Sequence, residues 1–267
     1  MAFERELSVA LDAAEAAGRL VRHHYDHFTA IPDAPSDIST EADRASQELI
    51  LQAIRKAFPL DAMVAEEKTP TLELVARSGS RLWIIDPIDG TRGFAIKNGE
   101  FSVMIAFVEN GRIGAGVVLE PATGLVTFAS RGSGCWCYRE SGGAKSQCHV
   151  SNAPDLSRAT LTQSRSRTAK ESPVVKKIKP AKVLETFSSG VKLARVAGGQ
   201  ADLFANIYPQ FNDWDICAGH ILVEEAGGKV TTLNGEPLIY GAEGNRQCAG
   251  LLATNGLIHE QALAALR

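Results

Sequence analysis

The chain has 267 residues, of which 45% are hydrophobic and 22% are charged, and its net charge is −3. This composition is that of a globular protein with a large core, and it offers no general attraction to nucleic-acid polymers or membranes. No apolar run approaches 18 residues and no basic, apolar leader opens the chain, so a cytoplasmic protein is expected. Five scattered cysteines argue against a disulfide framework and a structural zinc site. We expect one unit, with approximate halves at 1–150 and 151–267.

The first part of the chain predicts two helices joined by a loop. Apolar residues recur at helical spacing over residues 4–26, and again over 41–58. The loop 31–40 holds two prolines, and Ser39 or Thr40 is placed to cap the second helix. Asp43 lies in that helix's first turn, where the default interpretation is a surface acid that complements the helix dipole.

Two short strands that follow each end in acids. Residues 62–65 lead into Glu66-Glu67, and residues 82–85 lead into Asp86-Pro87. Paired acids at a strand end are usually solvated. Acids that converge from neighbouring strand ends, however, repel one another unless cations lie between them, and this favours a metal site.

The segment from Asp86 to Thr91 contains the strongest candidate chemistry. We expect the strand to end at Asp86, with Asp86-Pro87 opening a type I turn that lets Asp86 and Asp89 face one point. Gly90 allows close backbone approach, and a helix starting there would leave the Gly90 and Thr91 amides free for phosphate. Hard carboxylates beside such amides suit Mg²⁺; the alternative is an acidic surface turn. The Asp-x-x-Asp spacing favours metal-activated water over a covalent aspartyl nucleophile.

The middle of the chain predicts an antiparallel meander followed by a basic segment. Apolar runs flank Asn110-Gly111, a strong hairpin signal, and continue to Tyr138. Residues 165–182 then hold seven basic residues against one acid, and near a pocket these would steer anionic substrates. They are Arg165, Arg167, Lys170, Lys176, Lys177, Lys179 and Lys182.

The last part predicts a helix over 188–198, strands over 201–204, 229–232 and 250–254, and a closing helix over 257–266. Between them, the run from Asp213 to Gly219 opens a further helix with Asp215 at its start. A carboxylate in that position is often only a cap. Ala218 and Gly219 leave the helix end without bulk, which is what close approach to a ligand requires.

These segments together resemble the inositol monophosphatase superfamily of magnesium-dependent, lithium-sensitive phosphatases. The resemblance rests on four separated motifs in the expected order, and it covers essentially the whole chain. The motifs are Trp83-Ile-Ile-Asp86-Pro-Ile-Asp89-Gly-Thr91, Trp214-Asp215-Ile216-Cys217-Ala218-Gly219, Glu66-Glu67 and Ser39-Thr40-Glu41-Ala42-Asp43. It implies a layered αβαβα sandwich and a phosphoric monoester hydrolase.

The resemblance also implies roles for individual residues. Two or three Mg²⁺ ions would be held by Glu66, Asp86, the Ile88 carbonyl, Asp89 and Asp215. The phosphate would meet the Gly90 and Thr91 amides, with Asp89 and Asp215 also beside the substrate. Thr91 and Asp43 resemble the pair that orients and deprotonates the attacking water. By this likeness Asp43 is expected in the site and not on the surface, and Glu66 is expected to take part in catalysis as well.

For the substrate, the segment from Phe187 to Lys192 is similar to the branch that hydrolyses 3′(2′),5′-bisphosphate nucleotides. Ser189 and Lys192 would then hold the nucleoside and its second phosphate. This sequence departs from that branch at two places. Residues 32–37 lack the lysine that the branch has there, and Asn206 stands where the branch has an arginine. Inositol 1-phosphate and histidinol phosphate are the alternatives, and a non-catalytic phosphate-binding protein is a remote one. The sequence leaves the oligomeric state open, a homodimer included.

Overall fold

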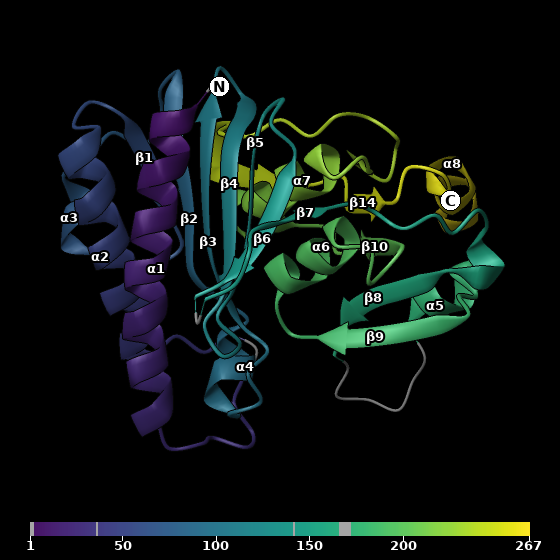
Figure 1. Cartoon of the computed structure of the whole chain (residues 1–267), viewed down its shortest axis with the longest axis horizontal. Helices are drawn as coiled ribbons and strands as arrows, with labels where there is room; N and C mark the ends of the chain where they lie inside the picture. The colour runs from purple at the N-terminus through teal and green to yellow at the C-terminus, as the bar shows by residue number, and fades with distance from the viewer. Residues whose placement is uncertain (1–2, 36, 141, 166–171) are drawn as a thin grey trace.

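The computed structural model describes residues 3–35, 37–140, 142–165 and 172–267. Within these ranges the chain forms five layers, in the order helices, sheet, helices, sheet, helices (Figure 1). The predicted αβαβα sandwich is therefore confirmed. Among the described helices none is long and apolar enough to cross a membrane.

The larger sheet has seven strands in sequence order. Its first two strands are parallel and the rest are antiparallel, which confirms the predicted meander around Asn110-Gly111. Its strands are β1 (Ala62–Ala65), β2 (Arg81–Asp89), β3 (Ser102–Glu109), β4 (Arg112–Glu120), β5 (Leu125–Ser130), β6 (Cys135–Arg139) and β7 (Ser146–Cys148).

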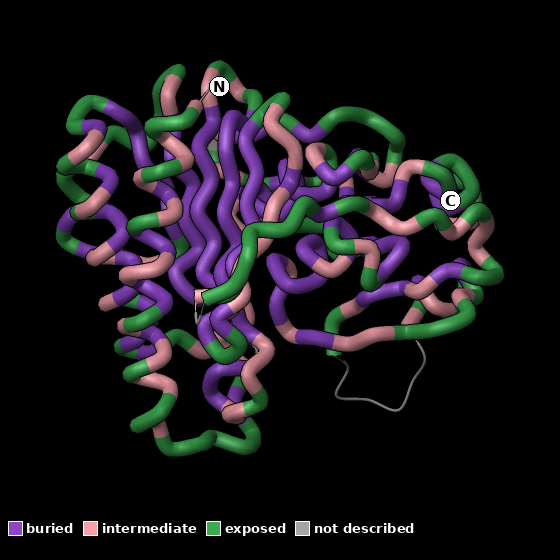
Figure 2. The backbone as a smooth tube through the Cα atoms, viewed as in Figure 1, coloured by how far each residue is buried: buried purple, intermediate pink, exposed green. Residues whose placement is uncertain are grey.

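Two helical layers cover the two faces of this sheet, so its central strands are buried on both sides (Figure 2). Because side chains alternate along a strand, Trp83 and Ile85 pack toward the outer helices, whereas Leu82 and Ile84 pack toward the inner ones. The outer layer is α1 (Glu4–His27), α2 (Glu41–Ala57) and the short α3 (Pro70–Glu73); the inner layer is α6 (Ser189–Ala197) and α7 (Cys217–Glu225).

A five-stranded sheet lies on the far side of the inner helices, in the order β12-β14-β10-β8-β9. A third apolar cluster packs its outer face against α5 and α8. The remaining elements are β8 (Thr160–Ser164), β9 (Lys182–Thr186), β10 (Leu203–Asn206), β11 (Phe211–Asn212), β12 (Lys229–Thr231), β13 (Arg246–Gln247), β14 (Leu251–Thr254), α4 (Thr91–Ala95), α5 (Pro173–Ile178), α8 (His259–Leu266) and three 3-10 turns, η1 (Leu156–Arg158), η2 (Asp213–Asp215) and η3 (Glu243–Asn245).

The expectation that the second strand ends at Asp86 in a type I turn is wrong. Strand β2 continues to Asp89, and an irregularity interrupts its pairing with β3. Asp86 pairs with Met104 and Asp89 pairs with Ser102, so β2 uses one more residue than β3 over this stretch. This is a β-bulge, which also accommodates Pro87 in a paired strand. The extra residue changes the alternation of side chains, so the two aspartates can reach the same pocket without a turn.

A smaller correction concerns Asp215. It lies in the turn η2, and α7 begins two residues later, at Cys217. The predicted helix start was therefore slightly early.

Candidate active site

One pocket of about 500 Å³ is lined by several acids, and three segments of the chain supply the four considered as metal ligands: Glu66, Asp86, Asp89 and Asp215. Strands β1 and β2 are parallel, with Ala65 opposite Ile85, so Glu66 emerges beside Asp86, where the bulge of β2 begins. The bulge in β2 supplies Asp86 and Asp89, and η2, packed against β2 and β3, supplies Asp215. We call this space the acidic pocket.

Crowding and burial disfavour the charged forms of these acids. Burial, then repulsion from Glu66 and Asp89, raises the pKa of Asp86 well above its usual value. Burial also raises the pKa of Asp215 to about 7, against the hydrogen bond from the Asn212 amide. For Glu66, burial and then repulsion from Asp215 raise the pKa to about 8, although this side chain lies at the exposed rim, where solvent weakens the effect. A cation bound among these acids would relieve their repulsion.

The donor chemistry of the acidic pocket fits a hard cation such as Mg²⁺. All four side chains offer carboxylate oxygens, and in three of them the protein holds one oxygen in place. Asp86 Oδ1 accepts from the Ile88 amide at 3.1 Å, Asp215 Oδ2 accepts from the Asn212 amide at 2.7 Å, and Asp89 Oδ2 accepts from the Gly190 amide at 2.7 Å. In the described part of the chain, however, no three acidic, histidine or cysteine side chains already converge as a metal-binding group. Binding would thus require these side chains to draw together.

Asp89 also fixes the start of α6. Its Oδ2 accepts from the hydroxyl of Ser188, which in turn accepts from the Val191 amide at 3.0 Å and so caps the helix. Sequence reasoning chose Ser189 instead of Ser188 for a role here. The only sequence signal for Ser188 is its place just before the helix, where serine is a favoured cap.

Thr91 and Asp43 form the second part of the site. The Thr91 hydroxyl lies 2.9 Å from Asp43 Oδ1 and 2.9 Å from the Ile88 carbonyl oxygen. Asp43 is buried, and its Oδ2 accepts from the Thr40 amide at 2.8 Å, which completes a capping box at the start of α2. The default placement of Asp43 on the surface is therefore wrong, and the predicted Thr40 cap is confirmed.

Gly90 lies at the turn from β2 into α4, and both it and Thr91 line the acidic pocket. Its φ of 87° falls in the left-handed region, and an added Cβ would lie 2.8 Å from the Glu100 carbonyl oxygen and 3.1 Å from the Ser188 amide. Only glycine fits this approach between β2 and α6.

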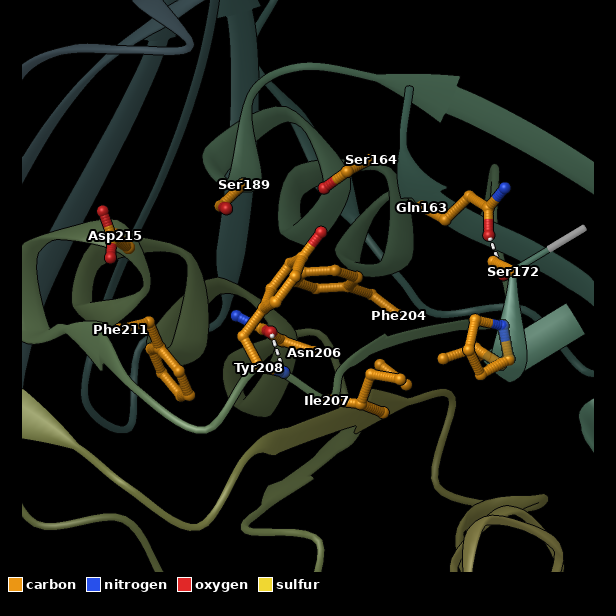
Figure 3. Close-up of a pocket in the computed structure, with 13 residues that line it drawn as sticks. Gln163, Ser164, Ser172, Ser189, Phe204, Asn206, Ile207, Tyr208, Phe211 and Asp215 are labelled. Atoms are coloured by element: carbon orange, nitrogen blue, oxygen red, sulfur yellow. Dashed lines mark hydrogen bonds between the residues drawn. The ribbon is translucent and has the colours of Figure 1, made fainter. Parts of the chain in front are cut away.

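A second cavity, of about 480 Å³, adjoins the acidic pocket and shares Ser164, Tyr208 and Asp215 with it. Its walls are mainly apolar and aromatic, so we call it the aromatic pocket (Figure 3). Ser189 lines it, as the sequence analysis expected of a substrate contact. The other rings and polar groups around it include Phe204, Phe211, Gln163 and Asn206.

Lys192 is not where the sequence analysis placed it. It is only 1% exposed and is not among the described residues that line either pocket. Its ammonium lies 5.2 Å from the centre of the Phe204 ring, behind the aromatic pocket, and burial lowers its pKa to about 8 despite the attraction of Asp89. Lys192 is therefore wrong as a direct contact to a second phosphate, because α6 turns that face into the core.

Among the described residues of the basic segment, one contributes to the acidic pocket. Arg165 lines it, paired with Glu100 and 3.5 Å from Glu185. Arg167 and Lys170 lie outside the described residues.

A family model described as the inositol monophosphatase family matches residues 3–267. The chain belongs to the inositol monophosphatase family. Among curated members of the family, a Thermotoga maritima fructose-1,6-bisphosphatase/inositol-1-monophosphatase is 34% identical over 84% of this chain and 80% of its own length.

Other relatives carry different names. The 3′(2′),5′-bisphosphate nucleotidase CysQ of Escherichia coli is 32% identical, over 85% of this chain and 90% of its own. A histidinol-phosphatase of Mycobacterium tuberculosis is 30% identical, over 98% and 97%. A solved Thermotoga maritima IMPase superposes with a TM-score of 0.80 at 30% identity, over 98% of this chain and 96% of that one. This inositol monophosphatase family member is accordingly a phosphoric monoester hydrolase, as predicted.

Proposed function

We propose that this enzyme removes the 3′-phosphate of a 3′(2′),5′-bisphosphate nucleotide in a Mg²⁺-dependent reaction. The observation that carries the proposal is the aromatic pocket, which opens directly beside the acidic pocket and shares Asp215 with it. A phosphate held among the carboxylates would leave the rest of its ester facing Phe204 and Tyr208.

The lining of the aromatic pocket favours a flat heterocycle over a polyol. Phe204, Tyr208 and Phe211 offer apolar and stacking surface, whereas inositol presents hydroxyl groups that need polar partners. Polar groups that would orient a base come from Gln163, Asn206 and the serines Ser164, Ser172 and Ser189. Histidinol phosphate also carries a ring, and one relative is named for it, so it is the alternative substrate.

Mg²⁺ bound by Glu66, Asp86, the Ile88 carbonyl, Asp89 and Asp215 would neutralise phosphate charge and lower the pKa of water. The protein's own part is to place and deprotonate the attacking water. Because the Thr91 hydroxyl can donate to Asp43, its lone pairs face outward as acceptors for that water. Burial raises the pKa of Asp43, against the bonds from Thr40, which suits a group that receives a proton. The Gly90 and Thr91 amides would hold the phosphate.

The second phosphate of such a nucleotide needs a cation, and Lys192 is buried behind the pocket. Arg165 is the better candidate, since it lines the acidic pocket near Ser164, which both pockets share. Its pairing with Glu100 would have to loosen as the phosphate binds.

The test compares kcat/KM for adenosine 3′,5′-bisphosphate, inositol 1-phosphate and histidinol phosphate, with Mg²⁺ and with a chelator. We expect the nucleotide to be preferred and all activity to need the metal. Tyr208→Ala should lower kcat/KM for the nucleotide by about tenfold, the worth of one lost stacking contact, and should hardly change that for inositol 1-phosphate. Arg165→Gln should act on the nucleotide alone, with Lys182→Gln, on an exposed strand of the same basic segment, as its control. A preference for inositol 1-phosphate in the unmodified enzyme would overturn the nucleotide assignment and leave the phosphatase assignment standing.

A further inference from the structure

Three of the five cysteines gather on one face of the larger sheet, away from the acidic pocket. Cys135 and Cys137 lie two residues apart on β6, so their side chains point the same way, and Cys148 lies on β7. All three pack into the apolar layer between this sheet and the inner helices. The cysteines are scattered along the sequence, and the pairing of β6 with β7 brings Cys148 back beside the other two.

The register of the two strands distinguishes the possible pairs. Cys135 is directly opposite Cys148, whereas Cys137 is opposite Ser146 and lies diagonally from Cys148. Residues directly opposite in an antiparallel pair have Cα atoms about 4.5–5.5 Å apart, within the usual disulfide range of about 4.4–6.8 Å. Diagonal neighbours are about 7–8 Å apart, which is too far without backbone movement. The Cys135–Cys148 pair is thus the one that the sheet prepares for a bond.

Access differs among the three thiols. Cys137 and Cys148 line a cavity of about 220 Å³ whose wall also holds Arg139, Arg195 and Glu120. Cys148 is 7% exposed, whereas Cys135 is fully buried. A small oxidant can therefore reach Cys148 and not Cys135.

We propose that Cys135 and Cys148 are a thiol pair that a peroxide converts into a cross-strand disulfide, with Cys148 as the residue that reacts first. The Cys148 thiolate attacks one peroxide oxygen, the O–O bond breaks, and the leaving oxygen takes a proton as water or alcohol. The Cys135 sulfur then attacks the resulting sulfenic acid, the S–O bond breaks, and the hydroxyl leaves as water with the Cys135 proton. Two thiols are oxidised and one peroxide is reduced.

The polarity of the cluster supports this order. Hydrogen bonds from the Cys135 thiol and then from the Cys137 thiol lower the pKa of Cys148 to about 7, against burial. The Cys135 pKa rises because its thiol donates to Cys148 and is buried. Of the three thiols, Cys148 is then the one with a substantial thiolate fraction near pH 7, and thiolates are the reactive form. The bond would fix β7, the edge strand, to its neighbour.

The test uses the reduced full-length protein and hydrogen peroxide at neutral pH, with thiol titration and peptide mapping under non-reducing conditions. We expect two thiols to disappear per chain, a Cys135–Cys148 peptide to form, and dithiothreitol to restore both. The variant Cys248→Ser, which lacks the exposed cysteine, should still lose two thiols per chain, those of Cys135 and Cys148. Cys148→Ser should leave Cys135 reduced, and Cys135→Ser should stop at a Cys148 sulfenic acid that dimedone traps.

A pair of variants separates the two roles of Cys135, which are to donate a hydrogen bond to Cys148 and to form the disulfide with it. Cys135→Ser keeps a donor beside Cys148, whereas Cys135→Ala removes it, so alkylation of Cys148 by iodoacetamide at pH 7 should be about tenfold slower in Cys135→Ala. Retained phosphatase activity would show that each variant is folded. The proposal is overturned if peroxide consumes Cys248 while Cys135 and Cys148 stay reduced, if the bridge maps to Cys137 and Cys148, or if the two Cys135 variants alkylate equally.

Discussion

Replacing Asp215 by asparagine should stabilise the metal-free enzyme while abolishing its turnover. Asp215 is largely removed from water, and Asp89 repels its charged form. The asparagine side-chain oxygen can still accept the bond from the Asn212 amide that Asp215 Oδ2 accepts at 2.7 Å. The substitution therefore removes a disfavoured charge and keeps the local hydrogen bond.

The size of the effect follows from the pKa. Its rise from 3.8 to about 7 means that the folded protein binds this proton more tightly than the unfolded chain does. The stability that this proton contributes is complete below pH 3.8 and is lost as pH rises toward 7. Each unit is worth about 1.4 kcal/mol, so the upper limit is about 4 kcal/mol. Partial exposure and relaxation of the neighbouring acids reduce this, and we expect about 2 kcal/mol at pH 8.

The measurement is urea unfolding in a chelator at pH 8 and at pH 4. Asp215→Asn should have the higher free energy of unfolding at pH 8, and the difference should shrink at pH 4, where the wild type is mostly protonated. Added Mg²⁺ should stabilise the wild type more than the variant, as ligand linkage requires.

Asp213 provides the matched control, because it undergoes the same chemical change two residues away. Both of its oxygens accept bonds, from the Gly241 amide at 2.8 Å and from Gln247 Nε2 at 2.7 Å. An asparagine there would face one of these donors with its own N–H groups, so Asp213→Asn should destabilise the protein. If Asp215→Asn instead has a lower free energy of unfolding than the wild type at pH 8, repulsion in the acidic pocket does not govern the stability of the metal-free enzyme.

Three further outcomes are expected. Thr91→Ser should retain most activity, whereas Thr91→Ala should lower kcat by about 10²-fold with a smaller change in KM, in steady-state assays. Gly190→Ala should lose about 1–3 kcal/mol of unfolding free energy, because its Cβ would lie 2.6 Å from the Ser102 hydroxyl oxygen; Gly198→Ala, whose nearest contact is 3.3 Å, should cost much less. Burial lowers the pKa of His259 to about 4, so its neutral form gives stability that is complete above pH 6.5 and lost as pH falls toward 4. In urea unfolding, His259→Gln should reduce the loss of unfolding free energy between pH 6.5 and pH 4 by up to about 3 kcal/mol.

Individual helices and strands and the acidic motif could be predicted because they depend on local patterns, whereas the layered fold followed from the resemblance to the family. The apolar run of β2 and the helical spacing of α1 and α2 are properties of neighbouring residues. The bulge was missed because Pro87 after Asp86 is equally typical of a turn, and only the pairing with β3 distinguishes them.

Features that depend on which helix face is buried, or on distant strands, were not predictable in this way. Lys192 was assigned to a second phosphate by resemblance to the nucleotidase branch, yet α6 is covered on both sides and this lysine is buried. The aromatic pocket draws on β8, β10 and the start of α5, which no sequence spacing connects. Ser188 and Ser189 are adjacent and chemically identical, so only the structure shows that the first caps α6 and the second faces the aromatic pocket.

The division of the acidic pocket between distant parts of the chain has a consequence for the order of events during synthesis. The larger sheet is formed by residues up to Cys148, mostly through hairpins between successive strands, and such local contacts form quickly. Asp215 leaves the ribosome much later and joins only when η2 and α7 pack against that sheet. A nascent chain therefore carries Glu66, Asp86 and Asp89 before Asp215 is available. It should meet its cation, and acquire activity, only in the last stage of folding.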